Sequence, residues 1–127
     1  MATPSNMTVG PYSTIRKAGN LYFISGAIGL DLTTKIADPD ILAQTAQTLD
    51  NLETVLVGAG LTLANVVKTT IFLTDIGDFA AVNAVYAKRF DLPYPARSAV
   101  AVSELPRVAS VPLKIEIEAI ASLEKDS

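Results

Sequence analysis

The 127-residue sequence contains no cysteine and no histidine. Without cysteine, disulfide bonds and thiolate metal sites are excluded. Without histidine, the chain lacks the commonest general base, the commonest transition-metal ligand and any Ser–His dyad, so a hydrolase triad is excluded. Any chemistry must therefore use carboxylates, arginine, lysine, tyrosine, hydroxyl groups, backbone groups or water.

Charge is also scarce in this sequence. Charged residues make up 18%, hydrophobic residues 50%, and the mean hydropathy is +0.37, whereas soluble domains average about 25% charged residues. So little charge is typical of a chain that buries surface against other copies, and we expect a homo-oligomer. The net charge of −3 gives no sign of the basic face that nucleic-acid binding needs, so nucleic acid is an unlikely partner.

Long apolar runs and linkers are missing as well. No apolar stretch approaches the roughly 20 residues of a membrane span, and Met1–Thr8 has neither the basic nor the apolar region of a signal peptide. We therefore expect a cytoplasmic protein with no membrane contact. The length and the absence of repeats or low-complexity segments predict a single domain, residues 1–127.

Hydrophobic patterning predicts five strands and two helices. β-branched and aromatic residues predict strands at 14–18, 21–28, 66–74, 97–103 and 113–123. Apolar residues at helical spacing predict a helix over 40–59, which would begin at Asp38–Pro39–Asp40 and end at Gly60 in a left-handed conformation. A second helix would follow Asp78 as its cap, with an apolar face of Phe79, Val82, Tyr86 and Phe90. Gly26 and Gly29 interrupt the second strand, which suggests a bulge or a close approach to the backbone.

This order, β-β-α-β-α-β-β, predicts an α+β two-layer sandwich with a mixed sheet of about six strands and two helices on one face. The opposite face also needs cover, because Tyr22, Ile24, Thr70 and Phe72 would be unfavourable in water. We expect subunits to pack sheet to sheet there.

Arg97 and two glutamates are the first candidates for chemistry. Arg97 opens a strand directly after a proline-rich turn, and its planar guanidinium matches a carboxylate. From spacing alone, a surface arginine at a strand end is the simpler interpretation. Glu116 and Glu118 share one face of the last strand with Lys114; they form either a solvated charged face or a site in which one carboxylate activates water beside the arginine.

Weaker candidates have simple structural explanations. Tyr12 is either a packed aromatic ring or a phenol at a pocket mouth, and Asn83 is either a structural amide or a ligand contact. Asp31, Asp38 and Asp40 could hold a hard cation but lack a loop signature, so helix capping explains Asp38 and Asp40 better. Residues 25–29 lack the lysine and the spacing of a phosphate-binding loop.

Taken together, these segments resemble the Rid (YjgF) family of reactive-intermediate deaminases over about residues 9–121. The segments that carry the resemblance are G-P-Y-S at 10–13, S-G at 25–26, T-L-D-N-L-E-T-V-L at 48–56, V-V-K-T-T-I-F-L-T-D at 66–75, D-F-A-A-V-N-A-V-Y-A-K-R-F at 78–90, Y-P-A-R-S-A-V at 94–100 and I-E-I-E-A-I-A at 115–121.

The resemblance implies a chorismate-mutase-like fold, a homotrimer with clefts between subunits, and hydrolysis of 2-imino acids and their enamine tautomers to 2-oxo acids and ammonia. It implies no cofactor and no metal. Catalytic roles fall on Arg97, which would bind the substrate carboxylate, and on Glu116, which would hold the water. Substrate-binding roles fall on Tyr12, Ser25, Gly26, Asn83 and the backbone amide of Ala99.

Three departures from the family pattern keep alternatives open. Ala99 stands where close relatives often have cysteine, Ala27 stands where glutamine is common, and the stretch Arg107–Lys114 is longer than usual. The longer stretch makes Glu118 an alternative to Glu116 for the carboxylate role. The alternative functions are a non-catalytic regulatory protein that binds small carboxylates and, less favoured, an endoribonuclease.

Overall fold

The computed structural model describes residues 10–124, so Met1–Thr8 and the expectation of no signal peptide there lie outside the described residues. The chain forms, in order, β1 (Ile15–Ala18), β2 (Leu21–Ile28), α1 (Ile41–Gly58), β3 (Val66–Leu73), α2 (Phe79–Arg89), β4 (Ala96–Ala101) and β5 (Ile115–Ser122). This order confirms the predicted β-β-α-β-α-β-β arrangement. Short 3-10 turns precede β3 and α2.

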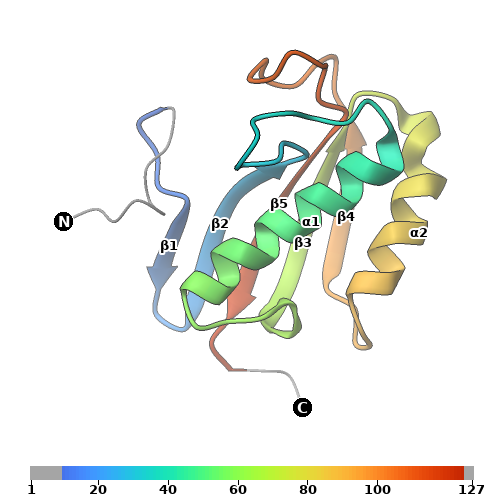
Figure 1. Ribbon diagram of the computed structural model, residues 1–127. Coiled ribbons are helices and arrows are strands. Elements are labelled where there is room, and N and C mark those ends of the chain that lie inside the picture. The colour runs from blue at the N-terminus through green and yellow to red at the C-terminus, as the bar shows by residue number, and fades with distance from the viewer. Residues whose placement is uncertain (1–9, 125–127) are drawn as a thin grey trace.

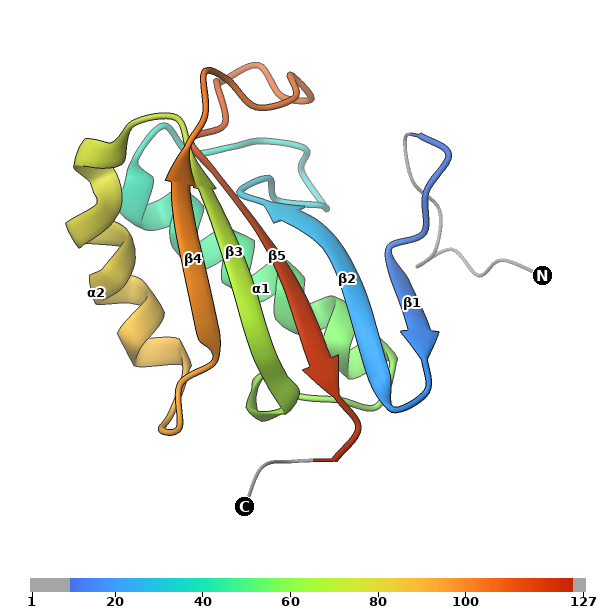
Figure 2. The same cartoon turned by 180° about the vertical axis from the view of Figure 1, so that it is seen from behind.

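The strands form one mixed sheet in the order β1-β2-β5-β3-β4, five strands rather than about six. β3 and β4 are parallel, because α2 crosses over between them, and the other neighbours are antiparallel. Both helices lie on the same face of the sheet (Figure 1). Seen from behind, the other face carries no helix (Figure 2). The predicted α+β two-layer class is therefore confirmed.

The helix ends differ in detail from the expected ones. Asp40, rather than Asp38, caps α1: its carboxylate accepts from the backbone N–H of Ala43. Gly60 has φ of +80° just beyond the helix, as predicted. Asp78 is the N-cap residue of α2, as predicted, but its side chain makes no capping hydrogen bond.

The core fills the space between the sheet and the helices. Three leucines of α1 are fully buried against alternate residues of the central strands, and each contributes about 1.5–3 kcal/mol relative to an exposed side chain. These fully buried residues are Leu49, Leu52, Leu56, Ile71, Leu73, Ile115 and Ile117. The alternation along β5 confirms the prediction that Glu116 and Glu118 lie on the face opposite the core.

The open face is composed differently from the expected one. Ile24 is in the core, and Tyr22 packs against the core from the same side of β2. Leu21 and Phe23 alternate with them, so they point to the open face and are 40% and 43% exposed. Placing Tyr22 and Ile24 on the open face was therefore wrong. Side chains alternate along a strand, so when Leu21 and Phe23 face outward, Tyr22 and Ile24 must face the core.

A bulge interrupts the pairing of β2 with β5. The register shifts between Ile24 and Ala27, so that Ser25 and Gly26 together lie opposite Glu118. This confirms the bulge suggested by Gly26, and it gives the Ser–Gly pair a local backbone different from the rest of the strand.

The longer stretch before β5 is fixed to the rest of the fold. Leu113 packs with Leu30 and Ala37 in a small second cluster. The fully buried Gln44 side chain donates to the carbonyl of Pro112 and accepts from the N–H of Lys114. These contacts set where β5 begins.

Candidate functional site

The predicted site residues lie on opposite faces of the sheet. Arg97 pairs in register with Thr69, whose side chain is fully buried beneath the helices, so Arg97 points to the helix face. Glu116 pairs with Phe72 and lies between the core residues Ile115 and Ile117, so it points to the open face.

Arg97 and Glu116 therefore cannot meet within one chain. β3 separates the strands that carry them, which places the backbones roughly 10 Å apart across the sheet. Their side chains then extend in opposite directions. Each residue belongs to a group of its own, which we call the arginine group (Phe79, Asn83, Tyr86, Arg97 and Ala99) and the glutamate group (Tyr12, Ser25, Gly26 and Glu116).

In the arginine group, α2 supplies an amide and two rings to the guanidinium. Nη1 of Arg97 donates to Oδ1 of Asn83 at 2.8 Å. Its Cζ lies 5.0 Å from the ring centroid of Tyr86 and 5.3 Å from that of Phe79, within cation–π range. Arg97 is nevertheless exposed, so its remaining N–H groups can reach a carboxylate in bidentate geometry.

The backbone amide of Ala99 points to the free edge of the sheet. Val102 N donates to Leu73 O on β3, and amide directions alternate along a strand, so the amide of Ala99 points away from β3. β4 is the last strand of the sheet on that side. Arg97 and the Ala99 amide are therefore available at the same edge.

Within the glutamate group, Glu116 lies across Gly26 at the bulge. A Cβ atom added to Gly26 would come within 2.6 Å of Cδ and 2.7 Å of Cγ of Glu116. Burial of this carboxylate, together with the negative charge of Glu118, raises the pKa of Glu116 above its ordinary value of 4.5. Glu116 is half-buried and Glu118 is exposed, so Glu116 has the environment expected of a proton acceptor.

Tyr12 and Ser25 line an open hollow of about 480 Å³ beside the glutamate pair. Its other lining residues are Pro11, Ser13, Arg16, Phe23, Ile24, Glu118, Ala119 and Ile120. The Ser25 hydroxyl donates to the carbonyl of Ser13 at 2.6 Å, and the Ser25 amide donates to Thr14 O. These bonds hold the segment that carries Tyr12 next to the bulge. Tyr12 and Ser25 share the hollow with Glu118 rather than with Glu116, which adjoins this region only through its contact with Gly26.

The aspartates considered for a metal have structural roles. Asp31 accepts from the backbone N–H groups of Thr34 and Thr33, which lowers the pKa of its carboxyl. Asp38 accepts from the N–H of Asp40, and Asp40 caps α1. Within residues 10–124, no three Asp, Glu, His or Cys side chains are grouped as metal ligands would be.

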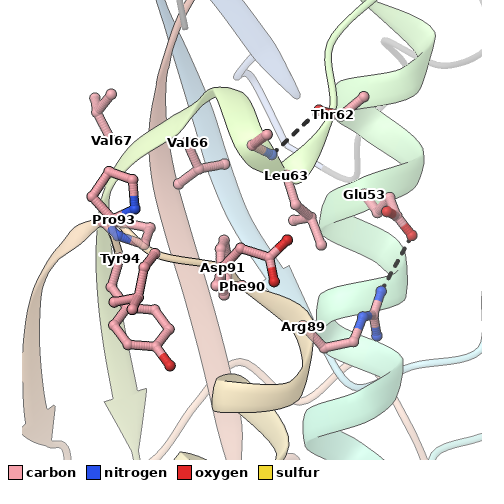
Figure 3. A pocket seen from close by; sticks show the side chains of 13 residues that line it. Glu53, Thr62, Leu63, Val66, Val67, Arg89, Phe90, Asp91, Pro93 and Tyr94 are labelled. Atoms are coloured by element: carbon pink, nitrogen blue, oxygen red, sulfur yellow. Dashed lines mark hydrogen bonds and ion pairs between the residues drawn. The ribbon is translucent and has the colours of Figure 1, made fainter. Parts of the chain in front are cut away.

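A second hollow, of about 440 Å³, lies between α1 and the segment that joins α2 to β4 (Figure 3). Arg89 reaches it but is paired with Asp50 at 2.8 Å and with Glu53 at 3.2 Å. None of the predicted site residues lines this hollow. The Arg89 charge is already balanced there, so this hollow is a weaker candidate for binding an anion.

Sequence reasoning missed the two rings against Arg97. Phe79 and Tyr86 were assigned only to the buried face of α2. Their spacing from Asn83, four residues before and three after, places all three side chains on one helical face, and this spacing was the available signal.

Comparison with known proteins identifies relatives along almost the whole chain. The family described as Endoribonuclease L-PSP matches residues 3–123. A RutC family protein of Pyrococcus horikoshii is 48% identical over 117 residues, covering 91% of this chain and 90% of that protein. The 2-iminobutanoate/2-iminopropanoate deaminase of Escherichia coli K12 is 42% identical over 116 residues, covering 89% and 88%.

Solved structures of related proteins have the same fold as this chain. RidA from the Antarctic bacterium Psychrobacter superposes with a TM-score of 0.85 at 38% identity, covering 93% of each chain. Escherichia coli TdcF with bound serine superposes with a TM-score of 0.82 at 38% identity, covering 91% of this chain and 90% of that one. Among residues 10–124, no helix is long and apolar enough to span a membrane.

Proposed function

The chain belongs to the YjgF/Rid family, described as Endoribonuclease L-PSP, and from that membership we propose that it hydrolyses 2-imino acids and their enamine tautomers to 2-oxo acids and ammonia. The observation that carries the proposal is the pair of complementary groups: an exposed, oriented arginine, and a half-buried carboxylate with a raised pKa. A relative named as a deaminase of 2-iminobutanoate and 2-iminopropanoate supports the same reaction.

Arg97 binds the substrate carboxylate in this proposal. Asn83 occupies one N–H of the guanidinium, and an outer edge remains for two parallel N–H···O bonds. The outward-pointing amide of Ala99 adds a neutral donor. This double contact fixes the position of the neighbouring C=N carbon. The translational and rotational entropy of the substrate is then lost on binding rather than in the chemical step.

Glu116 holds and deprotonates the water. A protonated imine is a strong electrophile, so water attacks its carbon as Glu116 accepts a proton. The nitrogen of the resulting carbinolamine takes that proton back from Glu116. The C–N bond then breaks, ammonia leaves, and the hydroxyl proton passes to Glu116 as the C=O bond of the 2-oxo acid forms. Because uncatalysed imine hydrolysis is fast, a rate gain of a few hundred-fold suffices, which corresponds to about 3–4 kcal/mol.

In this proposal two copies of the chain supply one site, which the placement of the arginine and glutamate groups on opposite faces of one sheet supports. We propose the homotrimer implied by the family resemblance, with the arginine group of one subunit facing the glutamate group of the next. A closed ring of such heterologous contacts repeats the site at every interface. The exposed open-face residues Leu21, Phe23 and Val100 supply apolar surface for the packing.

The test uses imine produced in situ by an amino-acid oxidase and trapped as its semicarbazone. Wild-type protein is expected to shorten the imine lifetime, and Arg97→Ala is expected to abolish this effect. Arg107→Ala is the matched control, because Arg107 is an exposed arginine whose only ion pair within residues 10–124 is a 4.0 Å surface contact with Glu104. Failure of wild-type protein with every imine side chain tried would refute the deaminase proposal.

A carboxylate-binding regulatory protein is the second candidate. The arginine group would bind a small carboxylate whether or not turnover follows, and a relative has been solved with serine bound. Calorimetry with 2-oxobutanoate separates the two: tight binding without imine hydrolysis favours the regulatory function. The family description also makes RNA cleavage worth testing, although the absence of histidine and the net charge of −3 argue against it.

A further inference from the structure

Tyr86 is held from three directions beneath the guanidinium of Arg97. Its hydroxyl lies 2.8 Å from Oγ1 of Thr69, and its ring centroid lies 4.5 Å from that of Phe90. The third contact is Arg97 itself, whose Cζ is 5.0 Å from the ring centroid. A ring fixed in this way is a rigid support rather than a mobile neighbour.

The hydrogen bond between Tyr86 and Thr69 is buried and links two elements. Tyr86 is 5% exposed and Thr69 is fully buried, so losing one partner would leave the other hydroxyl without a replacement from water. Thr69 is also the register partner of Arg97 on the adjacent strand. The bond therefore fixes the ring relative to the strand beside Arg97.

The contacts of the guanidinium define its plane. The Tyr86 and Phe79 rings attract the guanidinium cation, while Asn83 accepts from one N–H at its edge. With the rings and the amide supplied by one face of α2, the remaining donor edge has one favoured direction. A fixed direction matters for a planar carboxylate, because its two oxygens must meet two N–H groups of the guanidinium at the same time.

We infer that Tyr86, held by Thr69, is a positioning residue that sets the plane of the Arg97 guanidinium for carboxylate binding. This inference rests on the proposed function for the identity of the ligand. The orientation of Arg97 itself is independent of turnover. Since Arg97 holds the carboxylate in both the ground state and the transition state, losing the orientation raises KM and leaves kcat nearly unchanged.

The kinetic test removes the hydroxyl contact and then restores it. Thr69→Val and Tyr86→Phe are each expected to raise KM by about five- to tenfold with kcat within about twofold, as loss of uniform binding predicts. Thr69→Ser keeps the hydroxyl and is expected to restore KM. Val82→Ala is the control, because Val82 is fully buried in the same helix and lies outside the arginine group; it lowers Tm without changing KM.

A second measurement follows Arg97 without any substrate. The Nε–Hε signal of Arg97 in NMR is expected to carry a ring-current shift from both rings in wild-type protein, and Tyr86→Leu is expected to remove the part due to Tyr86 and leave the part due to Phe79. If wild-type protein shows no imine hydrolysis, this shift still tests the inference while the proposed function fails. An unchanged signal in Tyr86→Leu, or an unchanged KM in both Thr69→Val and Tyr86→Phe, would overturn the inference.

Discussion

The carboxylate of Glu116 occupies the space that any side chain at position 26 would need. Gly26 lies at the bulge of β2, and only glycine leaves room there for the carboxylate to lie across the backbone. Gly26 therefore has a physical role, because the space above it lets Glu116 become half-buried. Glu118, on the same face of β5, stays exposed.

Gly26→Ala is expected to lower kcat by about tenfold or more, equivalent to at least about 1.4 kcal/mol of transition-state stabilisation. The new methyl group forces Glu116 aside, while the exposed backbone tolerates alanine because φ is not positive at this residue. Gly58→Ala is the matched control, since nothing lies within 4 Å of its added Cβ. Equal activity of the two variants in the imine-trapping assay would contradict this role for Gly26.

Glu116→Gln is expected to abolish activity and, in the unassembled chain, where no guanidinium of another subunit faces the carboxylate, to raise Tm at neutral pH. The folded-state pKa of Glu116 is raised, so the native protein binds a proton more tightly than the unfolded chain does. Its contribution to stability is therefore fully present below the ordinary value of 4.5 and is lost as pH rises through the folded-state pKa. Thermal melts of both proteins at several pH values should show an advantage for the variant that grows with pH.

Glu118→Gln is expected to shift the acid limb of the kcat profile to lower pH. Burial is the larger cause of the raised Glu116 pKa and the charge of Glu118 the smaller one, so removing that charge lowers the limb without returning it to 4.5. The uncatalysed rate is subtracted at each pH. If Glu118 were instead the proton acceptor, Glu118→Gln would eliminate turnover and Glu116→Gln would spare it.

Gln44→Ala is expected to destabilise the fold by about 3 kcal/mol, because it removes three part-buried hydrogen bonds to the backbone together with a fully buried side chain. The side chain donates to the carbonyls of Asp38 and Pro112 and accepts from the N–H of Lys114. Gln47→Ala is the control: Gln47 is partly exposed and bonds only to Asn51 among the described residues. Urea unfolding of both variants measures the difference, and similar midpoints would contradict this role for Gln44.

The element order was predictable because each element carries a local signal. Alternation along β5 is confirmed, and the apolar stripe of α1 is buried at Leu49, Leu52 and Leu56, although Leu42 at its start is exposed. Where local signals competed, the sequence was ambiguous: Asp38 and Asp40 both suit a helix cap, and only the chain path selects Asp40.

The arrangement of the candidate site was less predictable. Arg97 and Glu116 were expected to act together at a cleft between subunits, but nothing local in the sequence shows that their strands are separated by β3 or that their side chains point to opposite faces. That depends on sheet order and register, which come from long-range pairing. The spacing of Phe79, Asn83 and Tyr86 on α2 was visible, but its partner on β4 was not.

The central claim is that Arg97 of one chain works with Glu116 of another. The most direct test mixes Arg97→Ala with Glu116→Gln, each inactive alone, by joint refolding at equal concentrations. Random assembly then gives about one quarter of the interfaces both wild-type residues, so about one quarter of wild-type imine hydrolysis should return. No recovery from mixed oligomers, whose formation is confirmed by differently tagged chains, would contradict a site shared between subunits.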